Sequence, residues 1–130
     1  MMTRVLVCGG RDYQDRTALY AALDRLHAER CFAVVITGGA RGADMLAADW
    51  AAVRDVATDT YHANWRFGRK AGPIRNKRML DEGRPDVVIA FPGGCDTAGV
   101  IALARAAGVE VVAAEAMIGP AHWLLELEKL

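Results

Sequence analysis

Short β-branched and apolar runs that stop at a pair of glycines recur along this chain. The three runs are RVLVC (residues 4–8) before Gly9-Gly10, AVVIT (residues 33–37) before Gly38-Gly39, and DVVIAF (residues 86–91) before Pro92-Gly93-Gly94. Unbroken runs of this kind are typical of parallel strands that are buried on both faces. A helical pattern follows each run, so the sequence predicts strands and helices in alternation.

Two further strands and four helices complete the predicted pattern. We expect a weaker strand over residues 55–63 and a fifth strand over residues 109–113. We expect helices over residues 16–29, 44–54, 73–82 and from a cap at Asp96 or Thr97 to Ala107. Residue types that favour helix ends support these bounds. They are Asp15 or Thr17 at the first start, Pro73 at the third start, and Gly83 and Gly108 at the last two ends. Residues 64–72 read as a polar loop, and residues 120–130 as a closing helix.

Strands joined by helices need crossover connections, which make the strands parallel and cover both faces of the sheet. We therefore predict one Rossmann-like, three-layer α/β/α domain over residues 1–130, with a mainly parallel five-stranded sheet in the order 3-2-1-4-5. The 130 residues are 53% hydrophobic, which is enough apolar surface for one core. No linker rich in Pro or Ser divides the chain.

The charges of the chain balance, with 16 Lys and Arg against 16 Asp and Glu. Sequence-independent binding of nucleic acid needs an excess of cations, so the composition disfavours nucleic acid as a partner. No apolar run approaches the roughly 20 residues of a transmembrane helix, and residues 1–10 lead into the first strand without a signal-peptide pattern. We expect a cytoplasmic protein without a membrane partner.

The glycine pairs predict a binding site for phosphate. Glycine lets backbone N–H groups approach an anion, and the N-terminus of the following helix adds positive partial charge. The carboxyl ends of parallel strands meet at one edge, and ligands bind there at the switch point, here between the first and fourth strands. The predicted contacts to a nucleotide or nucleotide derivative are Gly9, Gly10, Arg11, Gly38, Gly39, Arg41, Gly42, Asp44, Arg75, Asn76, Gly93, Gly94, Asp96 and Thr97. The alternative is that each glycine pair serves only a tight turn.

Several familiar site patterns are absent from the sequence. GxGxxG does not follow the first strand and GxxxxGK[ST] does not occur, so neither a dinucleotide fingerprint nor a P-loop is indicated. The three cysteines are far apart and form no CxxC, and the three histidines are isolated. We therefore expect no metal ion and no cofactor. Cys95 is interpreted as a small filler in a glycine loop, with thiol reactivity at a helix N-terminus as the alternative.

Four segments in order resemble the SLOG superfamily. They are GGRD (residues 9–12), GGARGAD (38–44), NWRFGRKAGPIRNKRML (64–80) and FPGGCDT (91–97). That Rossmann-like group includes the lonely-guy phosphoribohydrolases, the "lysine decarboxylase-like" proteins and the DNA-processing protein A family. The resemblance covers most of the chain and implies a nucleotide-type ligand and a homo-oligomer. The apolar tail, with Trp123, Leu124, Leu125 and Leu127, fits burial against a partner copy.

One departure from this resemblance concerns catalysis. In the phosphoribohydrolases, the motif PGGxGTxxE places a catalytic glutamate after the phosphate loop, and an arginine on the preceding helix assists. Here Asp96 stands in place of the third glycine, and Gly99-Val100 stand where the glutamate would be. Arg75 or Arg78 matches the helix arginine. The candidate catalytic residues are therefore Asp44, Arg75 and Asp96, and whether the protein is an enzyme stays open.

Three functions fit these residues. The first is a sensor or binding module for a nucleotide or nucleotide derivative. The alternative is phosphoribohydrolase-like cleavage of the N-glycosidic bond of a nucleoside 5′-monophosphate. The third is single-stranded nucleic-acid binding through Arg66, Arg69, Lys70, Arg75, Lys77 and Arg78, with Trp65 as a stacking platform. We expect Arg75 and Asn76 to face the pocket, and Lys77 and Arg78 to need no such position. For Trp65 we favour packing in the fold, and the alternative is that its ring stacks on a base.

Overall fold

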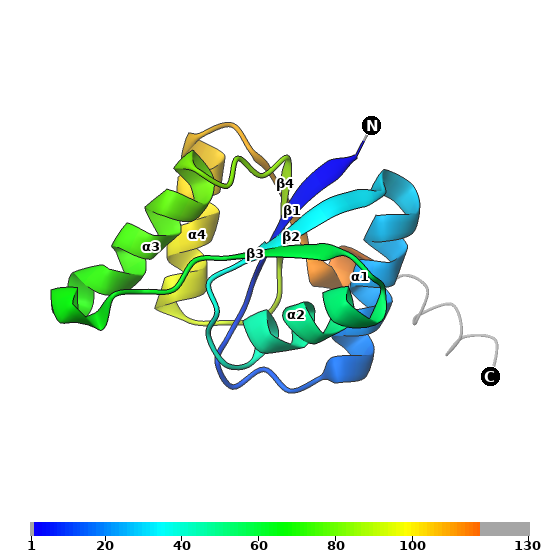
Figure 1. The fold of residues 1–130 in the computed structure, drawn as a ribbon, viewed down its shortest axis with the longest axis horizontal. Coiled ribbons are helices and arrows are strands. Elements are labelled where there is room, and N and C mark those ends of the chain that lie inside the picture. Colours follow the sequence, from blue (N-terminus) through cyan, green and yellow to red (C-terminus); the bar gives the residue numbers. More distant parts are fainter. Residues whose placement is uncertain (1, 118–130) are drawn as a thin grey trace.

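Five parallel strands form one sheet in the computed structural model, which describes residues 2–117 (Figure 1). The strands are β1 (Thr3–Cys8), β2 (Phe32–Thr37), β3 (Ala57–Thr60), β4 (Val87–Ala90) and β5 (Glu110–Ala113). They pair in the order β3-β2-β1-β4-β5, and every neighbouring pair is parallel. The predicted α/β class and strand order are confirmed.

The central strand β1 (Thr3–Cys8) supplies both cores of the molecule. Val5 and Val7 pack with the helices on one face, whereas Leu6 and Cys8 pack with the helices on the other. This alternation follows from the two-residue period of a strand. Because both faces are covered, the run is apolar at every one of these four positions rather than at every second one.

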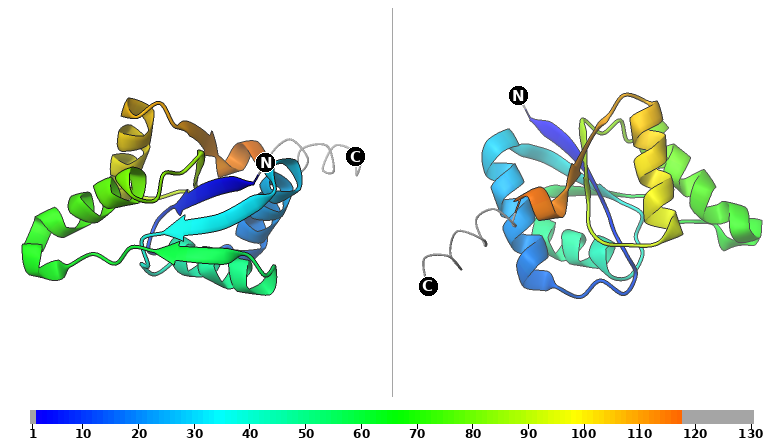
Figure 2. Two further views of the ribbon diagram at one scale, coloured as in Figure 1. Left: turned by 45° about the horizontal axis from the view of Figure 1, so that its top comes forward. Right: turned by 180° about the vertical axis from the view of Figure 1, so that it is seen from behind.

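Four α-helices and one 3₁₀ helix connect the strands. They are α1 (Arg16–Arg30), α2 (Ala43–Val53), η1 (Trp65–Lys70), α3 (Ala71–Asp81) and α4 (Cys95–Ala106). Helices α1 and α2 cover one face of the sheet, and α3 and α4 cover the other (Figures 1 and 2). The loops after β1 and β4 therefore leave the sheet toward opposite faces, which makes the edge between these strands the switch point.

The predicted N-caps of α1 and α4 can be compared with the structure. Asp15 caps α1 as expected, because its carboxylate accepts a hydrogen bond of 3.0 Å from the Ala18 N–H. Helix α4 begins earlier than predicted, with Gly94 as its N-cap and no side-chain cap bond, so the assignment of Asp96 or Thr97 as the cap is wrong. Both side chains lie inside the first turn, where the Asp96 carboxylate is engaged by side chains of α3.

The segment before α3 (Ala71–Asp81) also differs from the prediction. Residues 64–72 are not one loop, because Trp65–Lys70 form η1 and α3 starts at Ala71. Pro73 is therefore the third residue of that helix rather than the first. This position suits proline, because N–H groups in the first turn have no intrahelical acceptor. The predicted third strand is also too long, since β3 spans only Ala57–Thr60.

The predicted closing helix over residues 120–130, with its apolar side chains, lies outside the described residues. Among residues 2–117, no helix combines the length and the apolar character that a membrane span requires.

Candidate functional site

The loops after β1, β2 and β4 meet around a pocket of ≈ 220 Å³ at the carboxyl edge of the sheet. Its walls come from the strand end of β1, the β1–α1 loop, the first turn of α4 and the inner side of α3. The predicted site residues that line it are Gly9, Gly10, Arg11, Asp44, Arg75, Asn76, Gly94, Asp96 and Thr97. Gly38, Gly39 and Arg41 line an adjoining pocket of ≈ 250 Å³ instead. Gly42 and Gly93 border neither of these two pockets.

The first and third glycine loops are packed against each other. The Gly10 N–H donates to the Pro92 carbonyl at 2.8 Å. A Cβ on Gly9 would come within 2.6 Å of the Ala43 Cβ, and one on Gly93 within 2.7 Å of the Gly10 nitrogen. Glycine is therefore needed at these two positions because protein segments approach each other closely, which is a structural reason separate from ligand binding.

The second glycine loop closes the N-terminus of α2. Gly42 has a φ of 75°, a conformation that L side chains rarely adopt, and it lies directly against the backbone of Gly10 and Arg11. The first N–H of the helix, from Ala43, donates to the Gly10 carbonyl at 3.1 Å. The first N–H of this helix is thus taken up by the protein itself and is not available to an anion.

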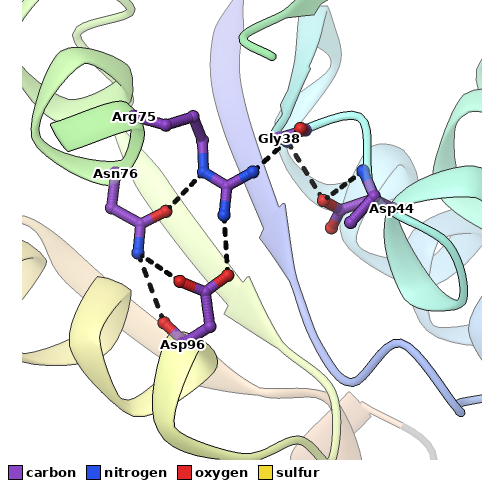
Figure 3. Close-up of polar contacts among 6 residues, drawn as sticks. Gly38, Asp44, Arg75, Asn76 and Asp96 are labelled. Carbon is purple, nitrogen blue, oxygen red and sulfur yellow. Dashed lines mark hydrogen bonds and ion pairs between the residues drawn. The ribbon is translucent and has the colours of Figure 1, made fainter. Parts of the chain in front are cut away.

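Asp44 is a buried carboxyl in the first turn of α2. One of its oxygens, Oδ2, accepts hydrogen bonds of 3.2 Å from the Gly38 and Ala40 N–H groups (Figure 3). Burial raises the pKa of Asp44 to about 6, against the lowering effects of these hydrogen bonds and of the charge of Arg75. Asp44 therefore holds the second glycine loop through these two hydrogen bonds. With a pKa of about 6, the Asp44 carboxyl loses its proton close to physiological pH.

Arg75 joins the glycine loop after β2 to helix α4. Its guanidinium donates to the Asn76 side chain at 2.7 Å, to the Gly38 carbonyl at 3.0 Å and to the Asp96 carboxylate at 2.7 Å (Figure 3). Asn76 in turn donates to Asp96 at 2.9 Å. Arg75 and Asn76 are buried and line the pocket, whereas Lys77 and Arg78 form exposed ion pairs four residues along α3.

The third glycine loop differs from the second because it leaves the N-terminus of the following helix accessible. Gly94 is the N-cap of α4 and carries no side-chain cap, so the first N–H groups of this helix lack a side-chain acceptor. A Cβ on Gly94 would meet no other atom within 4 Å, although Gly94 lines the pocket. Of the helix ends at this edge, the N-terminus of α4 is therefore the one with room for a ligand.

Arg11 is an arginine of the β1–α1 loop that faces both pockets at this edge. It lines both pockets described above, and its guanidinium lies over the Trp65 ring, 5.3 Å from the ring centre. It forms no ion pair with any residue between positions 2 and 117. The expectation that Trp65 packs in the fold is wrong, because its side chain is 59% exposed.

Several residues at this edge were not expected there. Met79 and Val100 line the first pocket one helical turn after Arg75 and Asp96, so helical spacing could have found them. His62, to which the sequence assigns no role, lines the adjoining pocket just beyond the carboxyl end of β3.

Cys8 also lines the first pocket, and its burial raises the pKa of the thiol to about 12, so this cysteine stays protonated. Within residues 2–117, no three His, Cys, Asp or Glu side chains are grouped to hold a metal ion.

Comparison with known proteins shows the family of this chain. A family model described as YAcAr, the YspA, cpYpsA-related SLOG family, matches residues 3–68. Gene 61 protein of Mycobacterium phage D29 is 41% identical over 120 residues, which cover 85% of this chain and 95% of that protein.

Two solved structures are similar to this chain at low sequence identity. DNA processing protein A from Streptococcus pneumoniae has a TM-score of 0.49 and 18% identity, with 85% of this chain and 58% of that chain covered. A proposed UDP-N-acetylglucosamine 2-epimerase from Listeria monocytogenes has a TM-score of 0.50 and 10% identity, with 87% and 31% covered. This chain thus spans only part of either structure. The family match and the phage relative together establish that the chain belongs to the YspA, cpYpsA-related SLOG family.

Proposed function

We propose that this protein is a binding or sensor module for a nucleotide or nucleotide derivative, with the ligand's phosphate in the pocket at the N-terminus of α4. The observation that carries this proposal is the combination of an open helix N-terminus with an arginine that forms no ion pair with the described residues. Gly94 leaves the first turn of α4 accessible, and Arg11 lines the same pocket. Backbone N–H groups at a helix start and a guanidinium both donate hydrogen bonds to phosphate oxygens.

The polar side chains of the pocket favour binding over turnover. All three nitrogens of the Arg75 guanidinium donate hydrogen bonds within the protein, and Asp96 accepts from both Arg75 and Asn76. These groups hold the loops in place, which leaves Asp44 as the remaining candidate catalytic group in the pocket. A site whose polar side chains are engaged in this way suits recognition of a ligand without turnover.

A phosphoribohydrolase-like activity is the second candidate, and Asp44 favours it. A carboxyl with a pKa of about 6 can exchange a proton near neutral pH, as a general acid or base must. In such a reaction the bond from C1′ of the ribose to the base nitrogen breaks and a water adds to C1′. The leaving base takes up a proton, and ribose 5-phosphate is the other product.

Isothermal titration with AMP, GMP, CMP and UMP tests the proposal, with chromatography of each mixture to detect free base. We expect at least one of these nucleotides to bind without release of base. The substitution Arg11→Ala should weaken that binding about tenfold or more, because a charge-assisted contact to phosphate contributes at least ~1.5 kcal/mol.

Arg105→Ala is the matched control. Arg105 lies in the last turn of α4, at the opposite end from the pocket, and forms no ion pair with a described residue. Equal weakening by both substitutions would contradict a phosphate contact by Arg11. Release of base that Asp44→Asn abolishes would establish the enzyme instead.

A further inference from the structure

A groove of ≈ 690 Å³ lies beside the phosphate pocket, on the outer side of α3 and α4. We call it the aromatic groove; its apolar walls are Trp65 of η1, Pro73 of α3, and Gly99, Ala102 and Leu103 of α4. Arg11, Asn76, Cys95 and Asp96 line both the groove and the pocket. The two hollows are therefore neighbours that share these four residues, and one small ligand can contact both of them.

Trp65 is the residue of this groove whose exposure the packing of the core does not explain, although the Arg11 guanidinium lies over its ring. The indole is 59% exposed, and no residue of η1 is buried. Figure 2 shows this segment, in green, projecting from the start of α3 away from the sheet. An aromatic side chain that contributes so little to the core is suited to contact with a ligand.

We propose that the aromatic groove holds the base of a nucleoside 5′-monophosphate, whose phosphate occupies the pocket at α4; this inference rests on the function proposed above. The flat face of a base gains contact with the Trp65 ring and with the apolar side of α4. Arg11 and Arg69 line the groove as well, and guanidinium groups also stack on aromatic rings. The residues that the groove shares with the phosphate pocket favour one small ligand that contacts both hollows over a separate protein partner.

The charges of the pocket favour one phosphate over a di- or triphosphate. Its lining includes the carboxyl groups of Asp44 and Asp96 beside the unpaired Arg11. The N-terminus of α2, which could have held a second phosphate, is closed by the Gly10 carbonyl. A longer chain of phosphates would bring added negative charge toward these carboxylates.

The test compares two exposed aromatic residues of the same 3₁₀ helix. Trp65 lines the groove, whereas Phe67, 56% exposed, lines neither the groove nor the pocket. Calorimetry measures the affinity of Trp65→Ala and Phe67→Ala for the tightest of the four nucleoside monophosphates and for ribose 5-phosphate, which lacks the base. We expect Trp65→Ala to weaken the nucleotide roughly 10- to 100-fold. Ribose 5-phosphate should bind both variants and the unchanged protein alike.

Fluorescence gives a second measurement that does not depend on the affinity. The base should quench tryptophan emission in the unchanged protein, and Trp65→Phe should bind the nucleotide with that change largely lost.

Equal nucleotide affinity of Trp65→Ala and the unchanged protein would overturn the groove assignment while leaving the phosphate site intact. If neither the nucleotides nor ribose 5-phosphate bind, the proposed function itself fails and this inference falls with it. Tighter binding of a nucleoside triphosphate than of its monophosphate would overturn the preference for one phosphate.

Discussion

Asp44 both stabilises a loop of the fold and lines the proposed binding site. Its side chain is 8% exposed and holds the Gly38 and Ala40 N–H groups, while the residue also lines the phosphate pocket. Burial raises the pKa of Asp44 from 3.8 to about 6. The folded protein therefore binds this proton more tightly than the unfolded chain does. Stability contributed by the protonated group is lost as the pH rises through about 6.

The substitution Asp44→Asn tests this pH dependence. The amide oxygen of Asn can still accept from the loop N–H groups, but it carries no charge. A pKa displacement from 3.8 to about 6 corresponds to about 3 kcal/mol. We expect the free energy of unfolding of Asp44→Asn, relative to the unchanged protein, to rise by about 2–3 kcal/mol between about pH 4 and about pH 7. Urea unfolding over this range measures it, and a constant difference at every pH would contradict it.

Arg75 provides a second prediction for a single residue. Its guanidinium is 4% exposed and joins the loop after β2 to α4, whereas the partner carboxylate of Asp96 is 46% exposed and can be hydrated when Arg75 is removed. We therefore expect Arg75→Met to lower the free energy of unfolding by about 1–3 kcal/mol, less than for a fully buried pair. The control is Lys77→Ala, which breaks a solvent-exposed pair on the same helix and should cost less than ~0.5 kcal/mol. Similar unfolding midpoints in urea for both variants would show that the Arg75 network adds no stability.

The positions of Arg75 and Asn76 at the pocket could be predicted from the sequence, because both residues belong to one of the four segments that resemble the SLOG superfamily. The partners of Arg75 could not be predicted, since Gly38 and Asp96 lie 37 and 21 residues away along the chain. For the same reason Asp96 was misassigned as a helix cap. Its residue type suits a cap, but its carboxylate is held by side chains of another helix.

At the scale of elements, the three glycine loops have different roles despite similar sequences. The second loop closes α2 against the β1–α1 loop, and the third leaves α4 open. Glycine is needed at Gly93 because protein atoms approach it, whereas Gly94 faces open space. The sequence predicts that the loops gather at one edge, but not which of them has room for a ligand, because that depends on contacts between loops.

The neighbouring substitutions Gly93→Ala and Gly94→Ala separate these roles. Gly93→Ala should lower the free energy of unfolding by about 2 kcal/mol or more, because the added Cβ would come too close to Gly10 and Thr97. Gly94→Ala should change stability by less than about 1 kcal/mol, the scale of a helix-cap exchange. It should nevertheless weaken binding of a nucleoside monophosphate in calorimetry, because the methyl group takes up space at the phosphate pocket. Unchanged affinity of Gly94→Ala would exclude phosphate contact at this position.

Most strands and helices were predictable to within one or two residues because a glycine pair or a buried apolar run marks their ends. The 3₁₀ helix η1 (Trp65–Lys70) was not, because its composition is that of a loop and no residue in it is buried. Its irregularity has a local cause, since Gly68 has a φ of 60° inside the segment. The edge strand β3 was predicted too long because its exposed, polar residues carry little of the alternating pattern that defines strand ends.

At the scale of the whole molecule, a formal net charge of zero conceals an uneven distribution of charge. Most arginines far from the pocket are paired with carboxylates, as Arg16 is with Asp49 and Arg30 with Glu110. Among the cations that line the hollows at the carboxyl edge of the sheet, three form no ion pair with a described residue: Arg11, Arg41 and Arg69. Arg75 and Lys77 line the same hollows but are paired, with Asp96 and Asp81. Composition alone could not predict this arrangement, because it depends on which partners the fold brings together.

This distribution predicts that ligand binding depends on salt more strongly than folding does. Unpaired cations attract an anionic ligand through water, and an ionic strength rising from about 0.02 M to about 0.2 M shortens the reach of that attraction from roughly 20 Å to roughly 7 Å. We expect the affinity for a nucleoside monophosphate to fall about tenfold over this range, while the urea midpoint of the ligand-free protein changes little, because its exposed ion pairs contribute little to stability. Calorimetry at several salt concentrations measures the slope, and Arg11→Ala should flatten it more than Arg105→Ala does. A slope that is the same for both variants would place the anion away from Arg11, and an affinity independent of salt would exclude phosphate as the group recognised at this edge.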